Sequence, residues 1–201
     1  MVNSGALYRG GVLVLPGGKP TSSAPSQPWR SANIRMAMLA SALRQRLGRD
    51  VLVRQVRYRL RGWNAERLDA VRDAEQALAD LVSAAGPAPV VLVGHSMGGR
   101  VAAHLAGHAG VTGVVALAPW WPAADADLIP AGCRLLTVHG TSDSWTDPAS
   151  SRIQTERALR RGVDAQWVGI PDAGHYMLRD ISGWNRLTCD FVTGQLEVAD
   201  G

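Results

Sequence analysis

The sequence predicts an α/β protein with a mainly parallel six-stranded sheet and helices on both faces. Three observations lead to this fold class. Short apolar runs alternate with segments of helical periodicity along the whole chain. Several of the runs are apolar at consecutive positions, which is typical of parallel strands buried on both faces. No linker, repeat or low-complexity tract interrupts the pattern, so we expect residues 1–201 to form a single domain.

The first three expected elements are a strand, a helix and a strand. Residues 12–15 are all apolar and stop at a Pro-Gly-Gly turn, as a buried strand does. Residues 31–47 repeat apolar side chains at helical spacing, with Ser31 as the expected N-cap and Gly48 as the stop. Residues 51–58 are expected to form the second strand.

A helix, a strand and a second helix follow. Residues 65–85 carry an apolar stripe at helical spacing. Residues 90–93 are four consecutive apolar residues preceded by two prolines, which indicates the third strand. The helix expected over residues 97–107 begins almost at once after this strand, so the junction between them is tight.

Five further elements complete the alternation. Two strands are expected at residues 114–118 and 135–139, with a proline-containing loop of 16 residues between them. The next elements are a helix that opens with Asp-Pro, a strand and a last helix. These three are expected at residues 147–161, 165–170 and 184–197.

Composition and charge argue against several classes of function. Hydrophobic residues make up 46% of the chain and charged residues 19%, as in folded globular proteins. The formal net charge is +4, but acidic residues are interspersed among the basic ones, so we expect no nucleic-acid partner. No apolar stretch reaches the roughly 20 residues of a membrane span, and no signal peptide is evident. We therefore expect a cytoplasmic protein without a membrane partner, with Cys133 and Cys189 as reduced, buried thiols.

The densest basic stretch contains Arg54, Arg57, Arg59 and Arg61. An exposed strand edge or a solvated loop is the favoured interpretation of such a stretch. The alternative is a site that attracts anionic substrates, and the sequence leaves it open.

The tight junction after residues 90–93 reads Gly-His-Ser-Met-Gly-Gly, a G-x-S-x-G motif between a strand and a helix. A serine on such a turn projects its hydroxyl above the end of the sheet, and the flanking glycines let neighbouring backbone pass closely. The N-terminus of the following helix favours developing negative charge at the same place. The motif predicts Ser96 as a nucleophile.

A serine nucleophile needs a general base, usually a histidine that an acid orients. After an elbow of this kind the acid and then the base follow later strands. Asp143 and His175 lie in the loops after the fifth and sixth expected strands, so we predict a triad with Ser96. Asp147 competes with Asp143 for the role of acid, but its place before a proline suggests a helix cap. Asp172 is expected to stabilise its turn.

The remaining histidines are expected to have structural roles. His95 directly precedes Ser96, so its side chain should point to the opposite face of the chain and pack or hydrogen-bond there in a structural role. His104 and His108 share a helix face at a spacing that could hold a metal, but no third ligand accompanies them, so we predict no metal site. His139 ends a strand and should hydrogen-bond locally.

An oxyanion hole requires two backbone N–H groups aimed at the developing alkoxide. Met97 follows the nucleophile and is the expected first donor. The second should come from the loop after the first strand. Gly18 is the favoured residue there, with Lys19 as the alternative.

These motifs resemble those of the α/β-hydrolase superfamily. The elbow at residues 94–99, the His-Gly-Thr-Ser-Asp stretch at 139–143 and Gly174-His175 match its nucleophile, acid and base loops. The short chain is similar to small, lidless bacterial members described as dienelactone-hydrolase-like or carboxylesterase-like. It departs from the pattern in lacking the first two strands of the eight-stranded sheet. It also carries Pro-Gly-Gly where many relatives carry His-Gly in the oxyanion loop.

Aromatic residues concentrate in the loops that should surround Ser96. Such a cluster predicts an aromatic-walled cleft, although the same side chains would also serve to roof the sheet. The substrate-binding candidates are Trp63, Trp120, Trp121, Trp145 and Tyr176.

The sequence thus predicts a serine esterase that acts on a small-molecule ester without a metal or other cofactor. A thioesterase or amidase with the same triad is one alternative, and a non-catalytic ligand-binding protein on the same scaffold is another. The oligomeric state is not predicted.

Overall fold

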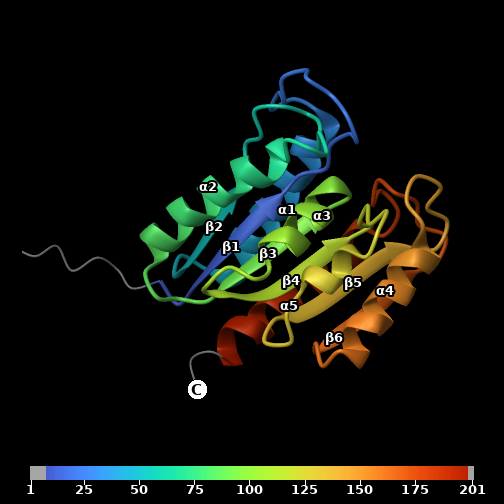
Figure 1. The fold of residues 1–201 in the computed structure, drawn as a ribbon. Coiled ribbons are helices and arrows are strands. Elements are labelled where there is room, and N and C mark those ends of the chain that lie inside the picture. Colours follow the sequence, from blue (N-terminus) through green and yellow to red (C-terminus); the bar gives the residue numbers. More distant parts are fainter. Residues whose placement is uncertain (1–7, 199–201) are drawn as a thin grey trace, which may run out of the picture.

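The computed structural model describes residues 8–198, and these form one six-stranded sheet with the order β2-β1-β3-β4-β5-β6 (Figure 1). Every pairing between neighbouring strands is parallel. The fold class predicted from the sequence is confirmed. The strands are β1 (Gly10–Leu15), β2 (Val51–Gln55), β3 (Val90–His95), β4 (Val111–Leu117), β5 (Arg134–Gly140) and β6 (Ala165–Ile170).

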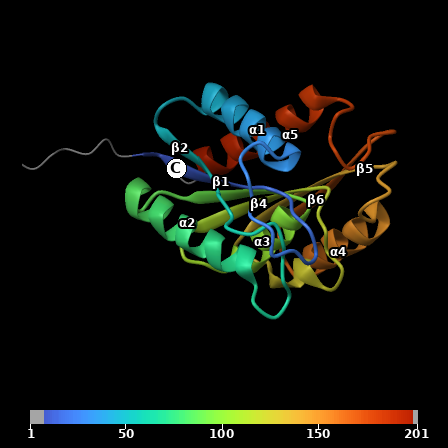
Figure 2. The same cartoon turned by 90° about the horizontal axis from the view of Figure 1, so that it is seen from above.

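Helices cover both faces of the sheet (Figure 2). The first and last helices lie on one face and pack against each other, and the other three long helices lie on the opposite face. The short 3-10 helix lies in the loop between β4 and β5, which holds no lid domain. The helices are α1 (Ser31–Leu47), α2 (Asp69–Ala85), α3 (Met97–Leu105), η1 (Asp125–Leu128), α4 (Pro148–Arg160) and α5 (Ile181–Val198).

The central strands are buried on both sides, which is why they read as continuous apolar runs. Successive residues of a strand point to opposite faces. Leu13 and Leu92 therefore belong to the core under α2 and α3, whereas Val12 and Val91 belong to the core under α1 and α5. All four side chains are fully buried.

Most element boundaries differ from the prediction by one to four residues, and two of these shifts have a clear structural cause. β2 ends at Gln55 because the chain then leaves the sheet and pairs with the loop after β1, through the bridges Lys19↔Gly62 and Pro25↔Leu60. α2 begins four residues later than expected because Asn64 and Leu68 adopt φ values of 53° and 49°, which are incompatible with a helix.

The predicted N-cap of α1 is also wrong. Arg30 occupies the cap position and no side chain caps the helix, while Ser31 is the first helical residue. The stop at Gly48 is confirmed, since this residue has a φ of 83° and its N–H donates to the Arg44 carbonyl. Both cysteines are buried and free, as expected.

The strand order places a switch point between β1 and β3. From β1 the chain crosses to one side of the sheet to form β2, and then returns past β1 to form β3. Loops that leave two such strands in opposite directions open a crevice at their carboxyl ends. The loop after β1 and the elbow after β3 meet in this crevice.

Close packing of glycines holds the elbow against the sheet. A Cβ on Gly98 would overlap the carbonyl of Leu15, and a Cβ on Gly94 would overlap the carbonyl of Gly98. We expect Gly98→Ala to lower the free energy of unfolding by about 2–3 kcal/mol, because the backbone of β1 must move. Urea denaturation at neutral pH measures this change.

Gly194→Ala in α5 is the matched control, because a Cβ there meets nothing within 4 Å. This substitution should raise stability by about 0.5–1 kcal/mol through helix propensity alone. Equal effects of the two substitutions would contradict the close packing of the elbow.

Candidate active site

Ser96 lies at the turn between β3 and α3 with φ 56° and ψ −117°. Positive φ is unfavourable for a serine, and neighbouring backbone holds it in place. The Ser96 N–H donates to the Leu117 carbonyl at 2.9 Å, and the Ser96 carbonyl accepts from the Trp120 N–H at 3.0 Å. The hydroxyl is thereby fixed above the end of the sheet.

The structure brings Ser96, His175 and Asp143 into one hydrogen-bonded chain. Ser96 Oγ lies 3.0 Å from His175 Nε2, and His175 Nδ1 lies 2.8 Å from Asp143 Oδ2. Since a carboxylate only accepts, His175 Nδ1 carries the proton and Nε2 is free to accept from the serine hydroxyl. The three residues follow β3, β6 and β5, whose carboxyl ends lie at the same edge of the sheet.

The Asp143 carboxylate is fully buried and heavily hydrogen-bonded. Its Oδ1 accepts from the N–H groups of Trp145 and Thr146 at 2.7 and 3.0 Å, and its Oδ2 accepts from the Thr146 hydroxyl at 2.8 Å. Burial alone would raise the pKa of Asp143. Hydrogen bonds from His139, His175 and the two N–H groups outweigh burial and hold that pKa well below its ordinary value, so the group stays ionised.

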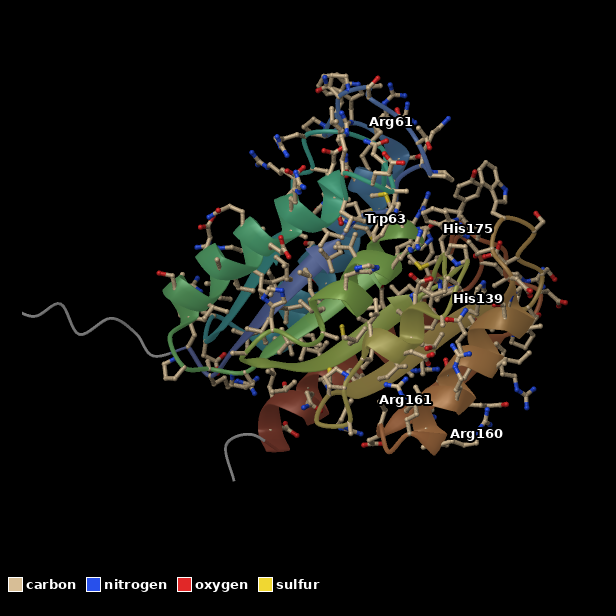
Figure 3. All side chains as sticks on the ribbon, in the orientation of Figure 1. Arg61, Trp63, His139, Arg160, Arg161 and His175 are labelled. Atoms are coloured by element: carbon tan, nitrogen blue, oxygen red, sulfur yellow. The ribbon has the colours of Figure 1, made fainter. Side chains whose placement is uncertain are left out.

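His139 is a second imidazole on the same carboxylate. It was expected to hydrogen-bond locally, and its Nδ1 does lie 2.8 Å from Ser151 Oγ. Its Nε2 lies 3.1 Å from Asp143 Oδ2, a contact that the sequence analysis missed. Figure 3 shows His139 and His175 at the same end of the molecule. The i, i+4 spacing from His139 to Asp143 was the available signal, but it has this meaning only in the loop conformation after β5.

His95 is buried, and its Nε2–H donates to the carbonyl of His175 at 2.9 Å, a structural hydrogen bond of the kind that was expected. Burial, together with the neighbouring His175, lowers the pKa of His95 to about 3. The ring is therefore neutral near pH 7, and it supports the loop that carries His175.

The depressed pKa of His95 predicts an acid-dependent loss of stability. Below pH 6.5 the unfolded chain takes up a proton at His95 and the folded chain does not, so acidification favours unfolding. Between pH 6.5 and 4.5 this should cost the wild type about 2–3 kcal/mol. Urea denaturation at both pH values measures the loss.

The variant His95→Gln can still donate to the His175 carbonyl but has no ring to titrate. Over the same pH range we expect its free energy of unfolding to fall by about 2–3 kcal/mol less than that of the wild type. Identical pH dependence of the two proteins would show that His95 titrates normally in the folded state.

Two backbone N–H groups fit the expected oxyanion donors. In residues 8–198, those of Met97 and Gly18 donate to no protein acceptor, whereas the Lys19 N–H is already bonded to the Arg61 carbonyl at 2.8 Å. The loop after β1 passes close to the nucleophile, since a Cβ on Gly17 would lie 3.4 Å from Ser96 Cβ. This geometry favours Gly18 over Lys19 as the second donor.

A cavity of about 290 Å³ opens beside Ser96 and His175. Trp145 and Tyr176 line it, and the Trp145 ring is stacked parallel to His175 with centroids 6.1 Å apart. Both side chains are well exposed, at 69% and 40%. Two of the five aromatic candidates therefore lie where the sequence analysis placed them.

The other aromatic candidates do not line this cavity. Trp63 is 2% exposed and packs under the loop against α3, with the Arg100 guanidinium 4.3 Å from its ring centroid (Figure 3). Trp121 is also buried, and its N–H donates to the Gly99 carbonyl. Trp120 packs against Trp63 and, together with Trp121, borders a second hollow that shares Trp145 with the cavity beside Ser96. The roofing interpretation therefore fits Trp63, whereas Trp120 and Trp121 line this second hollow.

The competing acidic residues have the structural positions that were expected. Asp147 caps α4, and its Oδ1 accepts from the Ala149 N–H at 2.9 Å. Asp172 sits in a turn with φ 55°.

His104 and His108 approach different carboxylates. Asp125 lies 3.8 Å from His104, and Glu75 lies 3.9 Å from His108. Over the described part of the chain, no three His, Cys, Asp or Glu residues cluster as metal ligands would. Within the same residues no helix has the length and apolarity of a membrane span.

The fold and the hydrogen-bonded chain at its edge define a protein of the α/β-hydrolase class. A family model described as the alpha/beta hydrolase family matches residues 12–137, which is more than half of the chain. The chain belongs to this family. A search of the curated proteins gives no match.

Solved structures share the fold at low sequence identity. Est1E from Butyrivibrio proteoclasticus is 10% identical, with 98% of this chain and 91% of that chain covered and a TM-score of 0.70. A serine hydrolase without a lid from Xanthomonas campestris is 21% identical, with coverages of 92% and 81% and a TM-score of 0.67. A CIB-like hydrolase from Thermoplasma acidophilum is 20% identical, with coverages of 96% and 88% and a TM-score of 0.62.

Proposed function

We propose that this protein is a serine hydrolase that cleaves a carboxylic ester of a small molecule through an acyl-enzyme. The observation that carries the proposal is the hydrogen-bonded chain from Ser96 through His175 to Asp143, at 3.0 and 2.8 Å. Membership of the hydrolase family supports it. Every group that the mechanism needs is a side chain or a backbone N–H of the chain itself.

In the first half of the reaction, Ser96 Oγ forms a bond to the carbonyl carbon of the ester and its proton passes to His175 Nε2. The carbonyl oxygen becomes negatively charged and accepts hydrogen bonds from the N–H groups of Met97 and Gly18. Asp143 stabilises the imidazolium that forms. Collapse of the intermediate breaks the carbon–oxygen bond to the alcohol, which leaves with the proton from His175.

In the second half, water attacks the acyl carbon and gives a proton to His175. The bond to Ser96 Oγ then breaks, and the serine oxygen recovers its proton from His175. The products are a carboxylic acid and an alcohol, and the protein returns to its starting state.

Labelling with a fluorophosphonate tests the proposal, because this reagent forms a covalent bond only to an activated serine. We expect one adduct, located by mass spectrometry on the peptide that contains Ser96. Ser142→Ala is the matched control, since Ser142 is an exposed serine beside Asp143 and its loss should leave labelling intact. Folded wild type that takes up no reagent, or takes it up at another serine, would overturn the assignment.

A further inference from the structure

The cavity beside Ser96 is lined by several cations and by no carboxylate. Of the residues that line it, the charged ones are Lys19, Arg30, Arg35 and Arg61. Arg35 and Arg61 are half-buried, and the other two are exposed. Arg61 belongs to the basic stretch for which the sequence left a solvated loop and an anion site open.

These four cations also have no acidic or hydrogen-bonding partner among the described residues. Within residues 8–198 none of their side chains forms an ion pair or donates a hydrogen bond, whereas Arg59 on the same loop pairs with Asp73 at 2.6 Å. Burial lowers the pKa of Arg35, whose guanidinium lies 5.1 Å from the Tyr176 ring centroid. Half-burying a guanidinium without a counter-charge is costly. Such a cost is expected where a ligand supplies the negative charge.

The N-terminus of α1 faces the same cavity. Ser31, Ala32 and Asn33 form its first turn and line the cavity, and no acidic residue lies in that turn. In the described structure their backbone N–H groups donate to no acceptor. A helix of 17 residues adds a partial positive charge at this end, so the free N–H groups and the cations favour the same kind of ligand.

Backbone hydrogen bonds hold the cationic loop in place. The Arg61 N–H donates to the Ala24 carbonyl at 2.9 Å, and its carbonyl accepts from the Lys19 N–H at 2.8 Å. Figure 1 shows the two segments side by side at one end of the molecule, and Figure 3 places Arg61 on the same side as His175. The backbone that carries Lys19 and Arg61 is therefore held in place before a ligand arrives.

We propose that the ester this site cleaves carries a carboxylate, bound by Arg35, Arg61 and the first turn of α1 while its ester carbonyl lies at Ser96. This inference rests on the proposed function and adds the substrate class to it. The planar guanidinium of arginine matches a carboxylate through two parallel hydrogen bonds. A volume of about 290 Å³ suits a small acid with one ring or a short chain.

Two probes that differ in charge but hardly in shape test the inference. They are 4-acetoxybenzoate and its neutral amide, 4-acetoxybenzamide, with each kcat/KM divided by the rate constant for hydroxide hydrolysis of the same ester. We expect this normalised kcat/KM to be at least tenfold higher for the benzoate than for the benzamide. Arg35→Gln and Arg61→Gln should each reduce the preference about tenfold, the size of a charge-assisted hydrogen bond.

Arg160→Gln is the matched control. Arg160 is an exposed arginine at the end of α4, and it lies well away from His175 (Figure 3), so its loss should leave both rate constants unchanged. If both esters are cleaved and the benzoate is not preferred, the carboxylate site is wrong while the hydrolase proposal stands.

Binding to the Ser96→Ala variant separates the two proposals. Calorimetry should detect 4-hydroxybenzoate binding at least tenfold more tightly than 4-hydroxybenzamide, with the difference lost in Ser96→Ala/Arg35→Gln/Arg61→Gln. Arginine-dependent binding without cleavage of any ester would overturn the hydrolase proposal and keep the anion site. Equal binding of the two ligands would overturn the anion site. Tighter binding of inorganic phosphate than of the benzoate would overturn the choice of a carboxylate.

Discussion

Replacing Ser96 by alanine is expected to lower kcat/KM for 4-nitrophenyl acetate by about 10⁴- to 10⁶-fold, as for other serine nucleophiles. Among the described residues the Ser96 hydroxyl is the only hydrogen-bond partner of His175 Nε2, so under the proposed mechanism no other side chain would form the acyl-enzyme. The backbone at this position has a positive φ that alanine tolerates about as well as serine, and the fold should persist. Initial rates at substrate concentrations far below KM give the change directly.

Thermal unfolding provides the control for this variant. The Tm of Ser96→Ala should stay within a few degrees of the wild-type value, since only one hydrogen bond is lost. A folded variant that retains more than about one hundredth of the wild-type rate would show that Ser96 is not the nucleophile.

Asp143→Asn should lower kcat/KM by about 10³- to 10⁴-fold. An asparagine can turn its NH₂ group toward His175 Nδ1, so that the proton of the His175 ring moves to Nε2. His175 Nε2 then has no lone pair to accept the serine proton. The substitution also removes the charge that stabilises the imidazolium. Steady-state kinetics near neutral pH measure the loss, and the pKa of Asp143, held below its ordinary value, keeps the wild-type group ionised there.

Asp147→Asn is the matched control, four residues away in the same loop. Its side chain caps α4 and makes no contact with His175, so activity should persist. An asparagine also caps helices well, so stability should change by only a few tenths of a kcal/mol. If Asp147→Asn abolished activity and Asp143→Asn did not, the acid would have been assigned to the wrong aspartate.

The sheet could be predicted from the sequence because its signal is local. A strand buried on both faces must be apolar at consecutive positions, and residues 12–15 and 90–93 satisfy this on their own. The positions of Ser96, Asp143 and His175 followed from chain order, since the carboxyl ends of parallel strands meet at one edge. Their roles remain a proposal for the experiments above.

The aromatic wall could not be predicted because loop side chains take their direction from distant partners. Trp63 is buried against residues such as Arg100, whose guanidinium lies over its ring, and these two residues are 37 positions apart in the sequence. The free first turn of α1 was missed for a similar reason. Ser31 looks like an ordinary N-cap until the cavity that faces it is known.

The pairing of the loop after β1 with the loop after β2 has a consequence for changing what the protein accepts. The segment that carries Arg61 is tied by its backbone to the residue beside the proposed oxyanion donor, through the Lys19 N–H and the Arg61 carbonyl. Mutant libraries aimed at new substrates should therefore vary side chains on this segment and leave its length alone. An insertion there would shift the loop that carries the proposed oxyanion donor as well as Arg61.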